Sequence, residues 1–200
     1  MNHLAHGFLA GGDVDFLLGG IAGDFFKGRL ERIDDVGLRR GVALHRRIDT
    51  FTDGHAVCRR ARARFPPALR RYAGIVTDMV FDHFLARHWD RYGTRMSLSR
   101  FSAVVYATLR AHEARLPPRF GGLLALMEEN DWLVSYTERS SIERAVDRIA
   151  ARVRGGEVLV GAVAGLGTNY DALECDFHAF FPLLTDFAAR ERIRLACEIS

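Results

Sequence analysis

A helical repeat of apolar residues runs through almost the whole chain and limits the folds available to it. Between Val36 and Phe51, apolar side chains recur every three or four positions, while arginines occupy the opposite face. The segment from Asp15 to Phe26 follows the same period, and the alternation typical of strands is scarce. The sequence therefore predicts an all-α fold.

Helix boundaries are marked by proline and by one serine. The Pro66-Pro67 pair ends a short basic helix, the Pro117-Pro118 pair follows a later one, and Ser97 is suited to cap that later helix. The expected helices are Asp15–Phe26, Val36–Phe51, His55–Phe65, Ala68–Trp89, Leu98–Ala114, Arg119–Asn130, Ser141–Val153, Val158–Asp176 and Phe177–Glu198. With 200 residues and no linker or internal repeat, residues 1–200 are predicted to form a single compact helical domain.

The cysteines and the N-terminal residues bear on the compartment. Cys58, Cys175 and Cys197 form no CxxC pair, which favours a reducing environment. The first residues lack the basic start and apolar run of a signal peptide, and no apolar stretch is long enough for a membrane span. A soluble cytoplasmic protein without membrane contact is expected.

Three groups of aspartate and histidine lie in the first half of the chain. They are Gly23-Asp24-Phe25-Phe26-Lys27-Gly28, His45-Arg46-Arg47-Ile48-Asp49 and Asp78-Met79-Val80-Phe81-Asp82-His83. On a helix, residues four apart share one face, so His45 lies over Asp49 and Asp78 over Asp82. Imidazole and carboxylate groups that converge on one point can bind a divalent cation that activates water.

Each group also has a purely structural interpretation. Asp24 alone could cap a helix or pair with Lys27, and His45 with Asp49 could be an ordinary surface ion pair. Asp82 interrupts an apolar run, where a buried carboxylate is costly unless it is paired or binds metal. A buried salt bridge from Asp82 to one of the many arginines therefore stays open.

The other histidines carry less information. His3, His6 and His88, taken singly, are typical of hydrogen-bonded core or surface histidines. His55, His112 and His178 are interpreted as residues without a functional role.

Arginine is concentrated in one region of the chain. Between Val36 and Arg71 there are ten arginines against two acids, Asp49 and Asp53. Such a basic flank predicts an anionic partner: phosphates of RNA, DNA or a cofactor, or an acidic protein surface. The run lacks interleaved aromatics and a known nucleic-acid motif, so nucleic acid is disfavoured.

Motifs along nearly the whole chain resemble the acyl carrier protein phosphodiesterase family. They are Asn2-x-Leu4-Ala5-His6, Gly23-Asp24-Phe25-x-Lys27-Gly28, Gly41-x-x-Leu44-His45-Arg46-Arg47-Ile48-Asp49-x-x-Thr52-Asp53, Asp78-x-x-x-Asp82-His83-Phe84-Leu85-x-Arg87-His88-Trp89, Trp132-Leu133-x-x-Tyr136, Tyr170-x-Ala172-Leu173-Glu174 and Phe180-x-Pro182. The resemblance implies hydrolysis of the phosphodiester that joins 4′-phosphopantetheine to a serine of holo-acyl carrier protein. It also implies a divalent cation, typically manganese, and a divergent HD-phosphohydrolase-like helical fold. This chain has only the reversed pair Asp82-His83, so ligand positions do not transfer from ordinary HD enzymes.

The chemistry implied by the resemblance assigns roles to these residues. The expected metal ligands are Asp24, His45, Asp49 and Asp82, with Asp24 the most important; this mixed donor set suits manganese or magnesium. His83 is the first candidate for the general acid or for support of a ligand, and His6 is the second. Lys27 and Arg46 are expected to contact the phosphate oxygens. The residues expected to bind substrate or the acidic carrier protein are Arg46, Arg47, Arg59, Arg60, Arg62 and Arg64.

Two other classes of function stay open on the sequence. One is an HD-type phosphohydrolase of a small nucleotide or phosphoester, which needs the metal but not the basic face. The other is a non-catalytic helical module that binds an acidic protein or RNA. The sequence does not indicate an oligomeric state.

Overall fold

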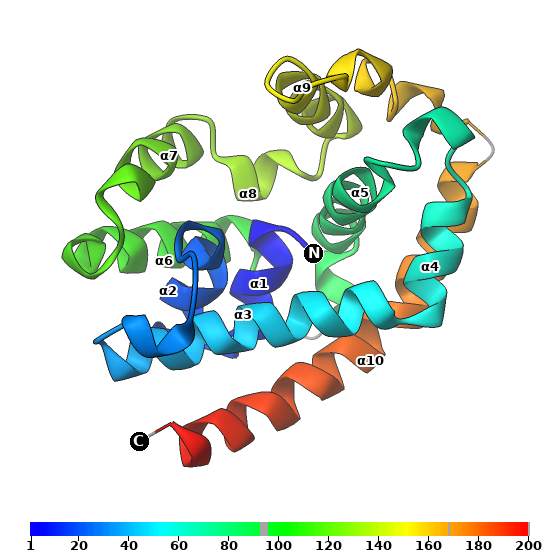
Figure 1. The fold of residues 1–200 in the computed structure, drawn as a ribbon. Helices are drawn as coiled ribbons and strands as arrows, with labels where there is room; N and C mark the ends of the chain where they lie inside the picture. The colour runs from blue at the N-terminus through cyan, green and yellow to red at the C-terminus, as the bar shows by residue number, and fades with distance from the viewer. Residues whose placement is uncertain (93–95, 168, 200) are drawn as a thin grey trace.

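The computed structural model describes residues 1–92, 96–167 and 169–199, and the secondary structure in these ranges is helical (Figure 1). The α-helices are α1 (His3–Leu9), α2 (Val14–Ala22), α3 (Val36–Gly54), α4 (Ala56–Ala63), α5 (Ala73–Arg87), α6 (Leu98–Ala111), α7 (Pro118–Glu129), α8 (Trp132–Ser135), α9 (Arg139–Ala150) and α10 (Asn169–Glu198). The prediction of an all-α fold is confirmed. None of the helices in the described ranges combines the length and apolar character needed to cross a membrane.

Side-chain caps start several helices close to the predicted positions. Asp13 accepts a hydrogen bond from the backbone N–H of Phe16 at the start of α2, and Asp35 accepts one from Leu38 at the start of α3. The Ser97 hydroxyl accepts one from Arg100, so the predicted cap of α6 is confirmed.

Two expectations about helices were wrong. Helix α10 runs unbroken from Asn169 to Glu198, through the predicted boundary at Asp176 and through Pro182. Its buried face, which includes Phe177 and Phe181, packs into the core and outweighs the hydrogen bond that a proline removes. The predicted start at Val158 is also wrong, because residues 156–167 contain only short 3₁₀ turns, with Gly161 at φ 72°.

The helices enclose α1 and α2. In Figure 1, α3 and α10 lie along one side, α7, α8 and α9 lie on the other, and the short α1 and α2 lie between. The phenyl rings of Phe81, Phe177 and Phe180 meet where α5 packs on α10, with centroids 5.6 and 6.3 Å apart. Helix α3 packs against α2 and α10, so it lies beside the segments that carry the other residues of the site.

Glycines allow α2 and α3 to approach until their backbones touch. A Cβ atom built on Gly19 would lie 2.3 Å from the backbone carbon of Gly41. A Cβ built on Gly41 would lie 2.1 Å from the backbone oxygen of Asp15. Neither position has room for a larger residue.

Gly41→Ala is therefore expected to lower the free energy of unfolding by about 1–3 kcal/mol, because α2 and α3 would have to separate. Urea denaturation measures the loss. Gly122→Ala in α7, whose added Cβ meets nothing within 4 Å, is the control and should be neutral or stabilising by up to about 1 kcal/mol. Equal stability of the two variants would contradict the close approach.

Candidate metal centre

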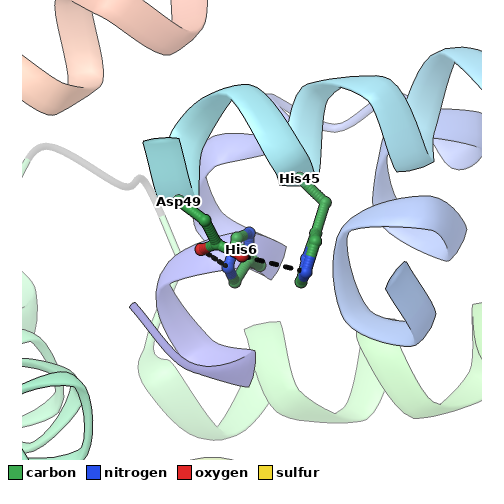
Figure 2. A group of neighbouring side chains, drawn as sticks. All are labelled: His6, His45 and Asp49. Carbon is green, nitrogen blue, oxygen red and sulfur yellow. Dashed lines mark hydrogen bonds and ion pairs between the residues drawn. The ribbon is translucent and has the colours of Figure 1, made fainter. Parts of the chain in front are cut away.

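Four side chains from three segments converge beside α1. His6 comes from α1, and His45 and Asp49 come from successive turns of α3 (Figure 2). Asp24 comes from the 3₁₀ turn Gly23–Phe25 that follows α2. His6 Nε2 lies 3.2 Å from Asp49 Oδ1, and His45 Nε2 lies 3.1 Å from Asp49 Oδ2 and 3.8 Å from Asp24 Oδ1. The two imidazole rings stack with centroids 4.2 Å apart.

The backbone fixes the orientation of the His45 ring. Its Nδ1–H donates to the carbonyl oxygen of Gly20 at 2.8 Å, so Nε2 faces the carboxylates of Asp24 and Asp49. A Cβ atom on Gly23 would lie 2.4 Å from this ring, so the turn can pass only because residue 23 is glycine. Histidines that bind metal usually donate their other ring N–H to a carbonyl or carboxylate in this way.

The electrostatics of the cluster show that it accommodates a positive charge. Burial lowers the pKa of the His45 imidazole, but hydrogen bonds to Asp24 and Asp49 outweigh it and raise that pKa to about 9. Burial raises the pKa of Asp49, and the contacts with His45 and His6 outweigh this and hold it well below its usual range. Burial dominates at His6, where the pKa falls to about 4. Two ionised carboxylates therefore surround the nitrogen that a proton or a metal cation would occupy.

The residues present fit a divalent cation. His6, His45 and Asp49 each offer a ligand atom, and these atoms lie within 4.8 Å of one another. The buried Nδ1 of His6 has no hydrogen-bond partner among the described residues, although buried polar atoms nearly always have one. A mixed set of imidazole and carboxylate donors suits manganese, magnesium or zinc rather than a soft ion.

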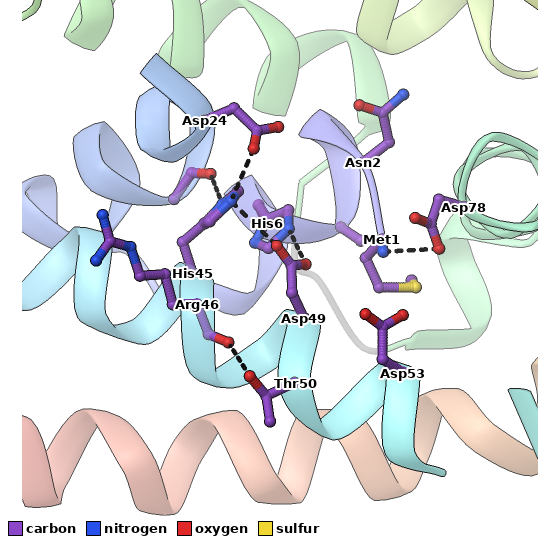
Figure 3. A network of polar contacts seen from close by, with 12 residues as sticks. Met1, Asn2, His6, Asp24, His45, Arg46, Asp49, Thr50, Asp53 and Asp78 are labelled. Carbon is purple, nitrogen blue, oxygen red and sulfur yellow. Dashed lines mark hydrogen bonds and ion pairs between the residues drawn. The ribbon is translucent and has the colours of Figure 1, made fainter. Parts of the chain in front are cut away.

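Two basic side chains lie at the same place. A pocket of about 440 Å³ is lined by Asp24, His45 and Asp49 together with Lys27 and Arg46, which were expected to contact phosphate. The Arg46 guanidinium donates to the carbonyl oxygen of Phe26 at 2.8 Å. Figure 3 shows Arg46 beside His45, with Asp24 on the side of the network away from α10. The pocket thus combines a candidate cation site with positive charges for a phosphoryl group.

Asp82 does not join this cluster. Its carboxylate accepts hydrogen bonds from the backbone N–H groups of Asn2, Leu4 and Ala5, at 3.1, 2.8 and 3.4 Å. Burial raises the pKa of Asp82 to about 7 against the effect of these donors. Asp82 was the fourth predicted metal ligand. It instead caps the first turn of α1 and so supports the helix that carries His6.

His83 is also directed elsewhere. Its ring contacts the carbonyl oxygen of Tyr136 at 2.7 Å and the hydroxyl of Tyr170 at 2.6 Å, so both nitrogens are engaged outside the cluster. Adjacent residues on a helix point about 100° apart, so Asp82 and His83 cannot both face α1. The expectation that His83 is the general acid receives no support from this position.

A second group of possible ligands lies between the end of α5 and α10. His88 Nε2 contacts Glu174 Oε1 at 2.5 Å, and His178 Nδ1 contacts the hydroxyl of Tyr92 at 2.5 Å. The ligand atoms of His88, Glu174 and His178 lie within 4.8 Å of one another. His178 was expected to have no role, yet its ring contacts tie the residues after α5 to α10.

Most of the arginines expected to bind the partner have internal partners. Arg60 and Arg64 hydrogen-bond the buried carboxylate of Asp176, at 2.6 and 2.7 Å in their shortest contacts. The other pairs are Arg62 with Asp53, Arg47 with Glu191 and Glu198, and Arg59 with the carbonyl oxygen of Gly54. Within the expected docking face, Arg60 and Arg64 thus hold α4 to α10, because the buried carboxylate of Asp176 needs compensating charge. Arg59 and Arg62 bond to residues at the end of α3.

The sequence analysis underestimated the part that His6 plays in the cluster. Its helix, His3–Leu9, has seven residues and was not among the predicted helices. The side chain of Asn2 makes no cap, and the cap comes instead from Asp82, far away in sequence. The motif Asn2-x-Leu4-Ala5-His6 was the signal available.

Comparison with known proteins identifies the family of this chain. The family model described as "Acyl carrier protein phosphodiesterase" matches residues 1–184. A relative of that name from Serratia proteamaculans (strain 568) is 34% identical over 193 residues, which cover 96% of this chain and 100% of the relative. Another, from Enterobacter sp. (strain 638), is 34% identical over 91% of this chain and 94% of the relative. One from Escherichia coli O45:K1 is 33% identical over 96% of this chain and 100% of the relative.

No solved structure matches the chain. The family model covers far more than half of the sequence, and the relatives match over nearly their full length. This chain belongs to the acyl carrier protein phosphodiesterase family.

Proposed function

We propose that this protein is a metal-dependent phosphodiesterase that removes the 4′-phosphopantetheine arm from the serine of holo-acyl carrier protein and leaves the apo-protein. One observation carries the proposal: in a chain of this family, His6, Asp24, His45 and Asp49 converge, and the last three line a pocket together with Lys27 and Arg46. A divalent cation and a phosphodiester are the two ligands that such a pocket accommodates.

His6, His45, Asp49 and Asp24 would hold the cation, and manganese is the proposed ion, with magnesium as the second choice. When bound, such an ion lowers the pKa of a coordinated water and neutralises charge on the phosphoryl oxygens. The hydrogen bond from His45 to Gly20 keeps the ring in one orientation, and Asp82 keeps α1 in place beneath His6.

Basic side chains of the pocket would bind the oxygens of the phosphoryl group. The guanidinium of Arg46, held by the carbonyl oxygen of Phe26, would bind a non-bridging oxygen. Lys27 is exposed at the mouth of the same pocket, where its ammonium can bind the other oxygen and supply a proton to the departing serine oxygen. Lys27 takes over the role first assigned to His83, which lies outside the pocket.

The proposal extends to the fold relationship, the domain organisation and the compartment of the protein. The fold is a distant relative of the HD phosphohydrolases, with His45 and Asp49 four residues apart on one helix in place of an adjacent His-Asp pair. Residues 1–200 form one domain. The protein acts in the cytoplasm, where the free thiols of Cys58, Cys175 and Cys197 would stay reduced.

The intact mass of holo-acyl carrier protein tests the proposal. Incubation with this protein and Mn²⁺ is expected to remove the mass of the phosphopantetheine arm, and excess EDTA is expected to abolish the loss. Added Mn²⁺ should then restore it. An unchanged mass across several metals and carrier proteins would sink the proposal, and hydrolysis of small phosphoesters alone would favour an HD-type phosphohydrolase.

A further inference from the structure

A second cavity, of about 320 Å³, lies next to the start of α1, the helix that carries His6. Its wall combines aromatic and apolar side chains, among them Trp132, Tyr136 and Ile149, with the polar side chains of Asn2 and Ser135. The residues come from the start of the chain, from α5 and from α7, α8 and α9, which enclose that side of the molecule in Figure 1. Such a lining suits a neutral chain with amide groups and branched methyls.

Helix α1 and the residue before it contribute side chains both to the cavity and to the candidate metal centre. Asn2 and His3 line the cavity, and His6, one turn further along the helix, belongs to the metal cluster. The Asn2 and Asp24 side chains both lie on the side of the network away from α10 (Figure 3). A ligand in this cavity would therefore contact residues that lie one helical turn from His6 of the candidate metal centre.

Three arginines line the cavity at helical spacing. Arg144 and Arg148 lie on α9 and Arg152 just beyond its end, all three exposed. Arg144 donates to the hydroxyl of Ser141 at 2.9 Å, and the Arg148 guanidinium lies 5.8 Å from the centre of the Trp132 ring.

Acidic side chains do not neutralise these arginines. Within the described ranges, none of the three forms an ion pair with a carboxylate, unlike Arg60, Arg62 and Arg64 of α4. The two acids of α9 have other partners: Glu143 pairs with Arg139, and Asp147 accepts a hydrogen bond from the backbone of Gly161. The exposed face of α9 is therefore left with uncompensated positive charge.

We propose that this face is the docking surface for holo-acyl carrier protein. The cavity binds the neutral pantetheine part of the arm, and Arg144, Arg148 and Arg152 bind the acidic surface of the protein that carries it. The proposal rests on the proposed function, since that function supplies both the arm and the acidic partner. It moves the docking surface from α4, whose arginines are occupied internally, to α9, whose arginines are not.

Binding measured without turnover tests the two parts separately. Titration calorimetry with holo- and apo-acyl carrier protein in EDTA gives two dissociation constants, and their ratio reports the arm alone because apo-protein lacks it. The wild type is expected to prefer the holo-form by at least about tenfold, because the arm buries apolar groups in the cavity. Ala145→Phe, which fills the cavity from α9, should abolish this preference, whereas Ala107→Phe on the exposed face of α6 should retain it.

Charge reversal addresses the protein contact. Arg144→Glu with Arg148→Glu is expected to weaken binding of both forms at least about tenfold and to leave the holo/apo ratio unchanged. Arg190→Glu, an exposed arginine on α10, should change either constant less than about twofold. Thermal melting shows whether each variant is folded.

Each outcome decides between the two proposals. No holo/apo preference in the wild type, or one that Ala145→Phe leaves intact, would overturn the assignment of the cavity. Equal weakening by Arg190→Glu would overturn the assignment of the arginines. If these effects are found but the mass of holo-acyl carrier protein never changes with metal, the docking surface stands and the hydrolase proposal fails.

Discussion

Asp49→Ala is expected to reduce kcat/KM for holo-acyl carrier protein roughly 1,000-fold. The Asp49 carboxylate contacts both imidazoles, at 3.2 Å from His6 and 3.1 Å from His45. Its loss would remove one ligand of the proposed cation and the group that orients both histidines. A metal ion supplies several kcal/mol of transition-state stabilisation, and each 1.36 kcal/mol corresponds to a tenfold change in rate. Steady-state assays by mass spectrometry, with Mn²⁺ binding measured in parallel, check both effects.

Asp53→Ala is the matched control for this variant. Asp53 lies one turn further along α3 and is exposed, where it pairs only with Arg62 among the contacts described. Its loss should change kcat/KM less than about twofold, since exposed ion pairs contribute little. Mn²⁺ affinity and turnover of Asp49→Ala within a factor of about three of the wild type would contradict the proposed metal centre.

Arg60→Ala combined with Arg64→Ala is expected to lower the free energy of unfolding by about 3 kcal/mol. The two guanidiniums are the cations that contact Asp176, whose side chain is 3% exposed. Removing them leaves a buried charge without compensation, which typically costs about 3–5 kcal/mol. Arg60 itself is 56% exposed, so water screens part of the interaction and the lower end of that range applies.

Urea denaturation with two controls isolates this effect. Arg70→Ala combined with Arg71→Ala removes the same amount of charge from exposed positions and should stay within about 0.5 kcal/mol of the wild type. Adding Asp176→Leu to the Arg60 and Arg64 changes should recover much of the loss, because no buried charge then remains. A double variant as stable as the wild type would refute a structural role for these arginines.

The same pair of arginines shows why a charge pattern alone misleads about binding. In the sequence, the run from Arg59 to Arg64 contains no acid, which favours an external anionic partner. The compensating residue, Asp176, lies more than 100 positions away and meets the arginines only because α10 packs against α4. Charge reversal on α4 would therefore report folding before it reported docking.

Helical periodicity, proline positions and the His45/Asp49 spacing are local properties of the chain, so the sequence alone determined the all-α fold, most helices and one half of the candidate metal cluster. The other half depended on contacts between distant segments. Whether Asp82 binds metal or caps α1, and whether His6 reaches Asp49, is decided by how α1 sits on α5 and α3. A short helix without its own cap has little intrinsic stability, so its position is a property of the packed structure rather than of its residues.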